Sequence, residues 1–186
     1  MPQHRRPAPL ALALALMAGV AALGASSAYA ASKSKPVVAK NVAQATLHDA
    51  QGREAGTVTL TVHDGMLHGT ASVNGISPGL HAIHIHTTGK CEVPGFTTAG
   101  GHLNPDAKQH GLQNPQGPHQ GDLPDIVVGA DGTGSGTFMA HSALATLLDA
   151  DGAAFVVHAG PDDNKTDPSG NSGGRILCGV IEKIGK

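Results

Sequence analysis

The chain has 186 residues with twelve Lys and Arg, fourteen Asp and Glu and twelve His, which gives a formal net charge of −2 at pH 7. This balance excludes nucleic acid as a partner, because binding its phosphate backbone requires a basic face. With three Phe, one Tyr and no Trp, the core must come from Val, Ile, Leu and Ala, and the many histidines require an explanation of their own.

Residues 1–30 are predicted to form a secretory signal peptide. Arg5 and Arg6 precede an apolar run over residues 8–23, and small residues then lead to Ala28-Tyr29-Ala30. A positive start, a short apolar segment and an Ala-x-Ala end are typical of such a peptide. The alternative is a membrane anchor, but the run is close to the lower length limit for a spanning helix and is rich in Ala and Gly. We therefore expect export, to the periplasm or outside the cell, by either the general or the twin-arginine route.

Removal of the signal peptide leaves 156 of the 186 residues, enough for one domain with a substantial core. Ten Lys and Arg then face fourteen Asp and Glu, a net charge of −4. Residues 31–40 are expected to be a flexible lead-in and residues 41–186 the folded domain. No other segment is long and apolar enough to cross a bilayer, so no stable membrane anchor is expected in the mature protein.

From residue 41 onward, short strands alternate with turns. Thr57 to Val62 alternates Thr with apolar residues, Asp64-Gly65 is typical of a tight hairpin, and Met66 to Val73 is the returning strand. Residues 143–148 fit either a short helical turn or a strand. Further strands are predicted at Leu80–His86, Ile126–Val128, Gly136–His141, Phe155–His158 and Ile176–Glu182. About eight short strands with Gly-rich turns predict an all-β fold, an antiparallel sandwich or barrel.

Two long segments interrupt this pattern, Cys91–Asp125 and Ala159–Arg175. Both are rich in Gly and Pro and poor in apolar residues. Long loops on a β scaffold are usually functional.

Cys91 and Cys178 are the two cysteines of the chain, and in an exported protein such a pair is predicted to form a disulfide rather than a metal or redox site.

The first candidate metal ligands are His84 and His86. Residues i and i+2 of a strand point to the same face, so these two imidazoles can converge on one metal. His-x-His alone is not specific, since packing can produce it. His81 has an odd offset from both and should face the other way.

The second candidate group lies in the first long loop. His102, His110, His119 and Asp122 fall within twenty-one residues, and three imidazoles with one carboxylate are a common zinc ligand set. The alternative is a solvated loop with scattered histidines, but so polar a loop has little else to hold it in place. His158 ends an apolar strand and by itself would be an ordinary strand-end histidine.

Taken together and in order, these segments resemble the Cu/Zn superoxide dismutase family. The resemblance covers residue 41 to the end of the chain and implies a Greek-key β-sandwich or barrel. The matching segments are Gly79 to His86, Gly100-Gly101-His102-Leu103-Asn104-Pro105, Lys108-Gln109-His110-Gly111, His119-Gln120-Gly121-Asp122-Leu123, Val156-Val157-His158 and Gly170 to Ile181.

The resemblance implies two metal cofactors and their ligands. Copper would be held by His84, His86, His102 and His158, and zinc by His102, His110, His119 and Asp122. His102 would then bridge the two metals through its two ring nitrogens. Asp162 would hydrogen-bond one copper-ligand and one zinc-ligand histidine, His84 and His110, and so orient both rings.

The resemblance also implies the reaction, which is the dismutation of the small anion superoxide to oxygen and hydrogen peroxide. Arg175 would guide the anion to copper, His102 would take and return a proton, and a Cys91–Cys178 disulfide would help to hold Arg175 in place. Residues 162–175 lack a clear match to the family's charged steering loop, where Lys165 is the candidate. The alternative function is a non-catalytic copper- and zinc-binding or metal-delivery module of the same fold. The resemblance is compatible with a homodimer but does not decide the oligomeric state.

Overall fold

The computed structural model describes residues 40–185. The predicted signal peptide, and the lead-in up to residue 39, lie outside the described residues. The described part of the chain forms ten strands, one short α helix and one 3-10 turn. Their bounds are β1 Lys40–Asp49, β2 Glu54–His63, β3 Met66–Val73, β4 Gly79–His81, β5 Ile83–His86, η1 Thr97–Ala99, β6 Ile126–Val128, β7 Gly134–Ala140, α1 Leu144–Leu147, β8 Ala154–His158, β9 Arg175–Val180 and β10 Glu182–Lys183.

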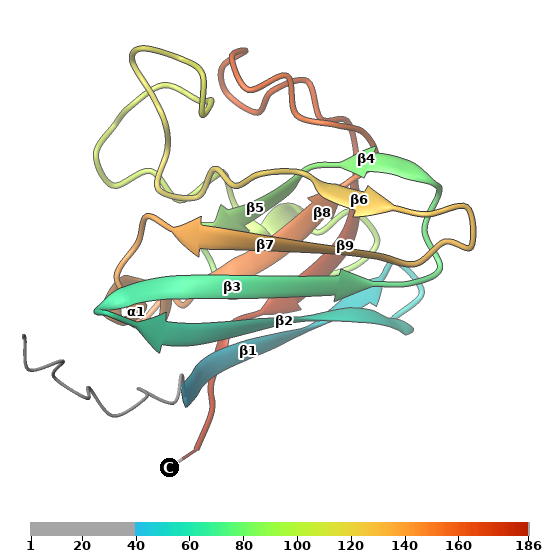
Figure 1. Ribbon diagram of the computed structural model, residues 1–186, viewed down its shortest axis with the longest axis horizontal. Helices are drawn as coiled ribbons and strands as arrows, with labels where there is room; N and C mark the ends of the chain where they lie inside the picture. Colours follow the sequence, from blue (N-terminus) through green and yellow to red (C-terminus); the bar gives the residue numbers. More distant parts are fainter. Residues whose placement is uncertain (1–39, 186) are drawn as a thin grey trace, which may run out of the picture. The chain divides into compact units, whose positions relative to one another are not determined.

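The strands form one antiparallel sheet that nearly closes into a barrel (Figure 1). Its order is β4-β6-β7-β3-β2-β1-β9-β8-β5, with β10 added beside β1. The two ends of this order, β4 and β5, are consecutive in the chain and separated by Ala82 alone. The neighbours β3 and β7, and β1 and β9, are not consecutive, as expected for the Greek-key β fold. The predicted all-β antiparallel fold is therefore confirmed.

The structure has ten strands where about eight were predicted, and tertiary hydrogen bonds account for one of the differences. The predicted strand Leu80–His86 is split at Ala82, whose N–H donates to Gly160 O at 2.9 Å and whose carbonyl accepts from His158 N at 2.9 Å. β1, which pairs with β2 along most of its length, was not delimited from the sequence. Residues 143–148, left open between helix and strand, contain the four-residue helix α1.

The barrel interior contains the predicted aliphatic core. Val58, Leu60, Ile83, Ile85 and Val157 are all fully buried. Phe138 and Phe155 join them with ring centroids 5.8 Å apart, so two of the three Phe also serve the core.

No helix formed by residues 40–185 is long and apolar enough to cross a membrane.

Both long loops lie at the same edge of the barrel (Figure 1). Residues 87–125 connect β5 to β6, and residues 159–174 connect β8 to β9. Hydrogen bonds join them: His110 N–H donates to Asp167 Oδ1 at 2.7 Å, and Gln113 N–H donates to Asn164 O at 3.1 Å. The candidate ligands on β5 and β8 therefore lie beneath a layer made by the two loops.

Candidate metal centre

Backbone hydrogen bonds fix the first loop to the edge of β5. Ile85 N–H donates to Gly121 O at 2.9 Å, and Leu103 N–H donates to Ile85 O at 2.8 Å. These contacts create isolated bridges that place His102 beside His86 and Asp122 beside His84. Residues that are 16 to 38 positions apart in the sequence are thereby brought together by main-chain geometry.

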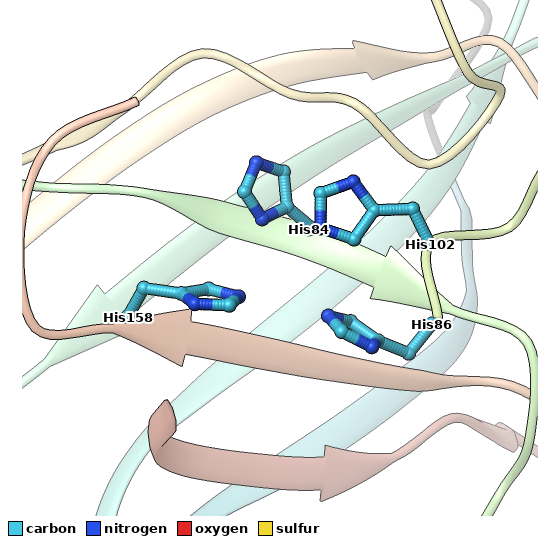
Figure 2. Close-up of side chains that lie close together, drawn as sticks. All are labelled: His84, His86, His102 and His158. Carbon is cyan, nitrogen blue, oxygen red and sulfur yellow. The ribbon is translucent and has the colours of Figure 1, made fainter. Parts of the chain in front are cut away.

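Four buried histidines converge on one space (Figure 2). His84 and His86 come from β5, His158 from β8 and His102 from the loop, and each has a ring nitrogen within 4.8 Å of the others. His84 and His86 lie on the same side of β5, with ring centroids 6.5 Å apart. The strand alternation sends their neighbours Ile83 and Ile85 into the barrel core instead.

One nitrogen of each of these four rings is buried without a hydrogen-bond partner among the described residues. These atoms are His84 Nδ1, His86 Nε2, His102 Nε2 and His158 Nε2. Burying a polar atom without a hydrogen-bond partner costs free energy, and native structures rarely contain such atoms. Four such atoms converging in one place fit a metal ion with imidazole ligands, for which copper is well suited.

The other ring nitrogens have partners that set their tautomers. His86 Nδ1–H donates to Gly100 O at 2.9 Å, and His158 Nδ1–H donates to Gly173 O at 3.2 Å. His84 Nε2–H donates to Asp162 Oδ2 at 2.8 Å. In each ring the opposite nitrogen therefore has a free lone pair directed into the shared space.

A second group surrounds the carboxylate of Asp122. Its Oδ1 lies 3.0 Å from His102 Nδ1, 2.9 Å from His110 Nδ1 and 3.2 Å from His119 Nδ1. Its Oδ2 accepts the backbone N–H groups of Gly111 at 2.8 Å and His119 at 2.9 Å, which hold the carboxylate in this orientation. Three imidazoles and one carboxylate at these positions fit a tetrahedral zinc ion. His84 also approaches this group, but its Nε2 is occupied by Asp162.

His102 belongs to both groups. Its Nδ1 faces Asp122, and its unpartnered Nε2 faces His84, His86 and His158. One ring thus presents a nitrogen to each group, which is the arrangement that a bridging ligand requires.

Asp162 connects the two groups by accepting a hydrogen bond from one histidine of each. Its Oδ2 accepts from His84 Nε2 at 2.8 Å, and its Oδ1 accepts from His110 Nε2 at 2.9 Å. Asp163, its exposed neighbour, instead caps the turn at Lys165 and Thr166. A carboxylate behind a ligating histidine fixes the ring and increases its basicity.

Burial and neighbouring charges set the pKa values of the cluster. Burial lowers the pKa of His84 to about 3, of His86 to about 2 and of His158 to about 4, so all three are neutral at pH 7 and free to bind a cation. Burial opposes charge on His110 too, but its hydrogen bonds with Asp122 and Asp162 raise its pKa to about 9. The His110 imidazole, between two carboxylates, therefore favours its protonated form, unlike those three rings.

Gly170 gives a direct test of Asp162. Its φ is +63°, and a Cβ added to it would overlap the Asp162 carboxylate and lie 2.7 Å from His110 Nε2. We expect Gly170→Ala to displace Asp162 and to weaken zinc binding about 10–100-fold, measured by chelator competition. Gly52→Ala is the matched control, because Gly52 has φ +76° and no atom within 4 Å of an added Cβ. Equal zinc affinity in both variants would show that Asp162 does not orient the site.

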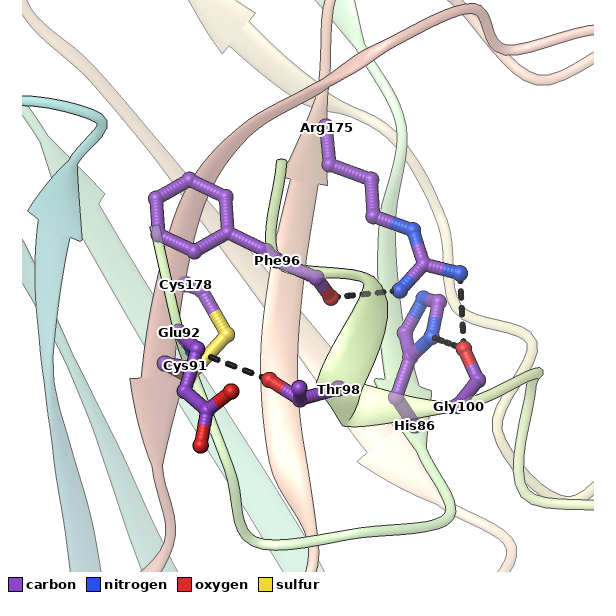
Figure 3. The surroundings of a disulfide bond; sticks show 8 residues. All are labelled: His86, Cys91, Glu92, Phe96, Thr98, Gly100, Arg175 and Cys178. Atoms are coloured by element: carbon purple, nitrogen blue, oxygen red, sulfur yellow. Dashed lines mark hydrogen bonds between the residues drawn. A yellow bond between two sulfur atoms is a disulfide. The ribbon is translucent and has the colours of Figure 1, made fainter. Parts of the chain in front are cut away.

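Arg175 lies at the start of β9 and reaches over the loop (Figure 3). Its Nη1–H donates to Phe96 O and its Nη2–H to Gly100 O, both at 2.7 Å. Gly100 O is also the acceptor of His86 Nδ1–H, so one carbonyl links the guanidinium to the histidine cluster. Arg175 makes no ion pair with a carboxylate of residues 40–185, so its charge remains free to attract an anion.

A disulfide joins Cys91 to Cys178, with Cα atoms 5.6 Å apart (Figure 3). It ties the start of the loop to the strand that carries Arg175. Phe96 is 1% exposed and packs with Cys178 in a small cluster of its own. The carbonyl groups that hold Arg175 therefore belong to a segment that is fixed both covalently and by packing. The structural role of Phe96 was not predicted from the sequence.

A hollow opens above the histidines. It is lined, among others, by His86, His102, His158, Lys108, Asp167 and Arg175. Lys165, the candidate steering residue of the sequence analysis, does not line it, whereas Lys108 of the first loop does. His81 belongs to neither group, and both of its ring nitrogens have partners: Nδ1 lies 2.7 Å from His158 O and Nε2 2.9 Å from Ser77 O.

Comparisons with known proteins agree with this geometry. Residues 54–181 match the family described as Copper/zinc superoxide dismutase (SODC). Superoxide dismutase [Cu-Zn] of Caulobacter vibrioides is 42% identical over 152 residues, 75% of this chain and 85% of that protein. Superoxide dismutase [Cu-Zn] 2 of Aquifex aeolicus is 39% identical over 148 residues, 75% of this chain and 85% of that protein.

Solved structures show the same likeness. The Cu/Zn superoxide dismutase of Brucella abortus superposes with a TM-score of 0.63 at 32% identity, covering 75% of this chain and 98% of that one. A protein of Bacillus subtilis described as SOD-like superposes with a TM-score of 0.71 at 38% identity, covering 77% and 99%. The family match over residues 54–181 includes β2 to β9, both loops and the histidine clusters, and the chain belongs to the copper/zinc superoxide dismutase family.

Proposed function

We propose that this protein is an exported enzyme that converts two superoxide anions and two protons into one oxygen and one hydrogen peroxide. The observation that carries the proposal is the set of four buried, unpartnered imidazole nitrogens beneath Arg175. A purely structural histidine cluster would satisfy these atoms by hydrogen bonds within the protein. Copper and zinc are the cofactors of the family to which the chain belongs.

His84, His86, His102 and His158 would hold copper, and His102, His110, His119 and Asp122 would hold zinc. Bound copper supplies a one-electron redox couple, and bound zinc supplies a fixed charge that holds the loop. Asp162 would keep the rings of His84 and His110 in their ligating orientation. The mature protein would begin after Ala30.

Two residues that line the hollow would bind the substrate and transfer a proton to it. Arg175 would pair with the charge of the incoming superoxide. His102 Nε2 would hold one proton between the two half-reactions and deliver it to the second superoxide, which also takes a proton from water. His102 is 8% exposed and lines the hollow, which fits a proton carrier that water reaches from that side.

Lys108 is proposed to raise the rate of encounter with superoxide. The protein without residues 1–30 is negative overall, so positive side chains at the hollow must attract the anion locally. We expect Lys108→Gln to lower kcat/KM by about two- to fivefold at low ionic strength, with the difference shrinking as salt is added. Lys165→Gln removes the same charge outside the hollow and should change kcat/KM less. The opposite order of effects would assign steering to the second loop.

The function itself is tested by metal content and activity measured on the same sample. The purified protein should contain one copper and one zinc per chain and consume superoxide at a rate that approaches the diffusional limit. Chelator-stripped protein should be inactive and should recover activity only when both metals are restored. Protein that carries both metals but shows no turnover would contradict the proposal.

The second candidate function is a non-catalytic metal-binding or metal-delivery module of the same fold, and a protein of Bacillus subtilis described only as SOD-like has this fold. The unpaired Arg175 above an open hollow favours catalysis, because a carrier has no need of an anion guide. Location outside the cytoplasm is proposed from residues 1–30 together with the Cys91–Cys178 disulfide. Periplasmic, cell-surface and released forms are alternatives, as are the monomer and a homodimer.

A further inference from the structure

Two histidines and two methionines lie together on the outer face of β2, β3 and β7, away from the residues of the metal centre. The hairpin Asp64-Gly65, with φ values of 50° and 81°, sets His63 of β2 directly opposite Met66 of β3. β3 also pairs with β7, and this register sets His68 of β3 directly opposite Met139 of β7. Directly opposed residues have Cβ atoms about 4.5–5.5 Å apart, so each His–Met pair is in contact range. The rings of His63 and His68, with centroids 5.8 Å apart, join the two pairs.

The sheet alternation directs this cluster outward. Leu67, between Met66 and His68, is buried in the core, whereas Met66 is 51% exposed and Met139 is 52% exposed. The rings of His63 and His68 meet edge to face with centroids 5.8 Å apart. Two thioethers and two imidazoles therefore share one patch of surface, which we call the outer His–Met cluster.

Each imidazole has a nitrogen available for a ligand. His63 Nδ1 lies 3.3 Å from Asp64 Oδ2, which leaves Nε2 free. His68 Nε2 is buried and has no hydrogen-bond partner within residues 40–185. A carboxylate on one ring nitrogen with the other nitrogen free is the usual arrangement around a metal-ligating histidine.

We propose that His63, Met66, His68 and Met139 bind Cu(I), forming a second copper site on the outside of the barrel. Thioether sulfur is a soft ligand that favours Cu(I), and imidazole also suits copper, whereas magnesium, calcium and manganese prefer oxygen ligands. The short hairpin and the three-strand register hold the ligands in place without any loop. This site goes beyond the proposed dismutase activity, since none of its residues belongs to the copper and zinc groups.

The test uses the purified protein already loaded with copper and zinc, so that the inner sites are filled. Cu(I) is added under anaerobic conditions in competition with a chromogenic Cu(I) chelator. We expect one additional equivalent per chain, with both sulfur and nitrogen neighbours in its X-ray absorption spectrum. The double variant Met66→Leu/Met139→Leu should weaken this binding at least about tenfold, while superoxide consumption stays unchanged.

Two controls keep the result specific. His48→Gln changes an exposed strand histidine outside the cluster and should leave the additional equivalent in place. Met→Leu conserves volume, so the double variant should fold, and His63→Gln/His68→Gln tests the same site through its imidazoles. No additional Cu(I), or Cu(I) held equally well by both double variants, would overturn the proposal.

Discussion

Replacing His102 with alanine should abolish superoxide consumption and remove copper and zinc together. Its ring presents one nitrogen to each group: Nδ1 lies 3.0 Å from Asp122 Oδ1, and Nε2 faces the other three histidines without a partner among the described residues. We expect activity to fall by more than about 100-fold, because even a residue that only orients a ligand typically costs 10–100-fold. Activity and the content of both metals should be measured on the same sample.

A matched control distinguishes the loss of a bridging ligand from a general effect of removing a histidine. His141→Ala removes an exposed histidine that belongs to neither group, and it should retain both metals and full activity. Loss of copper alone from His102→Ala, with zinc still bound at normal affinity, would contradict the bridging role. In that case His110, His119 and Asp122 would suffice for zinc.

Removing the disulfide should produce the largest loss of stability. Cys91 and Cys178 are 87 residues apart, and closing so long a loop restricts the unfolded chain by roughly 4–5 kcal/mol in the loop-entropy treatment. We expect Cys91→Ser/Cys178→Ser to lower the free energy of unfolding by about 2–5 kcal/mol. Denaturant titration of the metal-loaded protein measures this, with thiol-reduced wild-type protein as the control. A difference smaller than about 1 kcal/mol would contradict it.

The same variant should also lower kcat/KM while copper and zinc remain bound. Arg175 is hydrogen-bonded to Phe96 O and Gly100 O, and both carbonyls lie in the segment that the disulfide ties to β9. A more mobile segment would position the guanidinium less well for the anion, whereas the metal ligands on β5 and β8 keep their own backbone support. Unchanged kcat/KM with reduced stability would limit the disulfide to a structural role.

Local pattern was sufficient to predict much of the barrel. The strand Met66–Val73 and its Asp64-Gly65 turn were predicted with the bounds that the structure has, because period-two alternation and the hairpin dipeptide depend on neighbouring residues only. The same period placed His84 and His86 on one face. The break at Ala82 could not be predicted, since it arises from hydrogen bonds to Gly160 and His158, which are distant in the sequence.

The composition and order of the candidate ligands were readable from the sequence, and their resemblance to a family supplied roles for each. What the sequence by itself determined is therefore the fold class, the pairing of Cys91 with Cys178 and the chemistry of the residues offered to a metal. Residue types and short-range spacing are sufficient for these conclusions because they depend on local geometry and on chemical preference.

Only the tertiary structure decided which groups meet. It placed Lys108 rather than Lys165 at the hollow, buried His81 against the His158 carbonyl, and assembled the outer His–Met cluster from three strands. Loop conformation and strand register determine these contacts, and both depend on packing and hydrogen bonds between residues far apart in the chain. The pattern of neighbouring residues in the sequence does not predict such contacts. Their consequences for steering and for copper binding therefore follow only from the folded barrel.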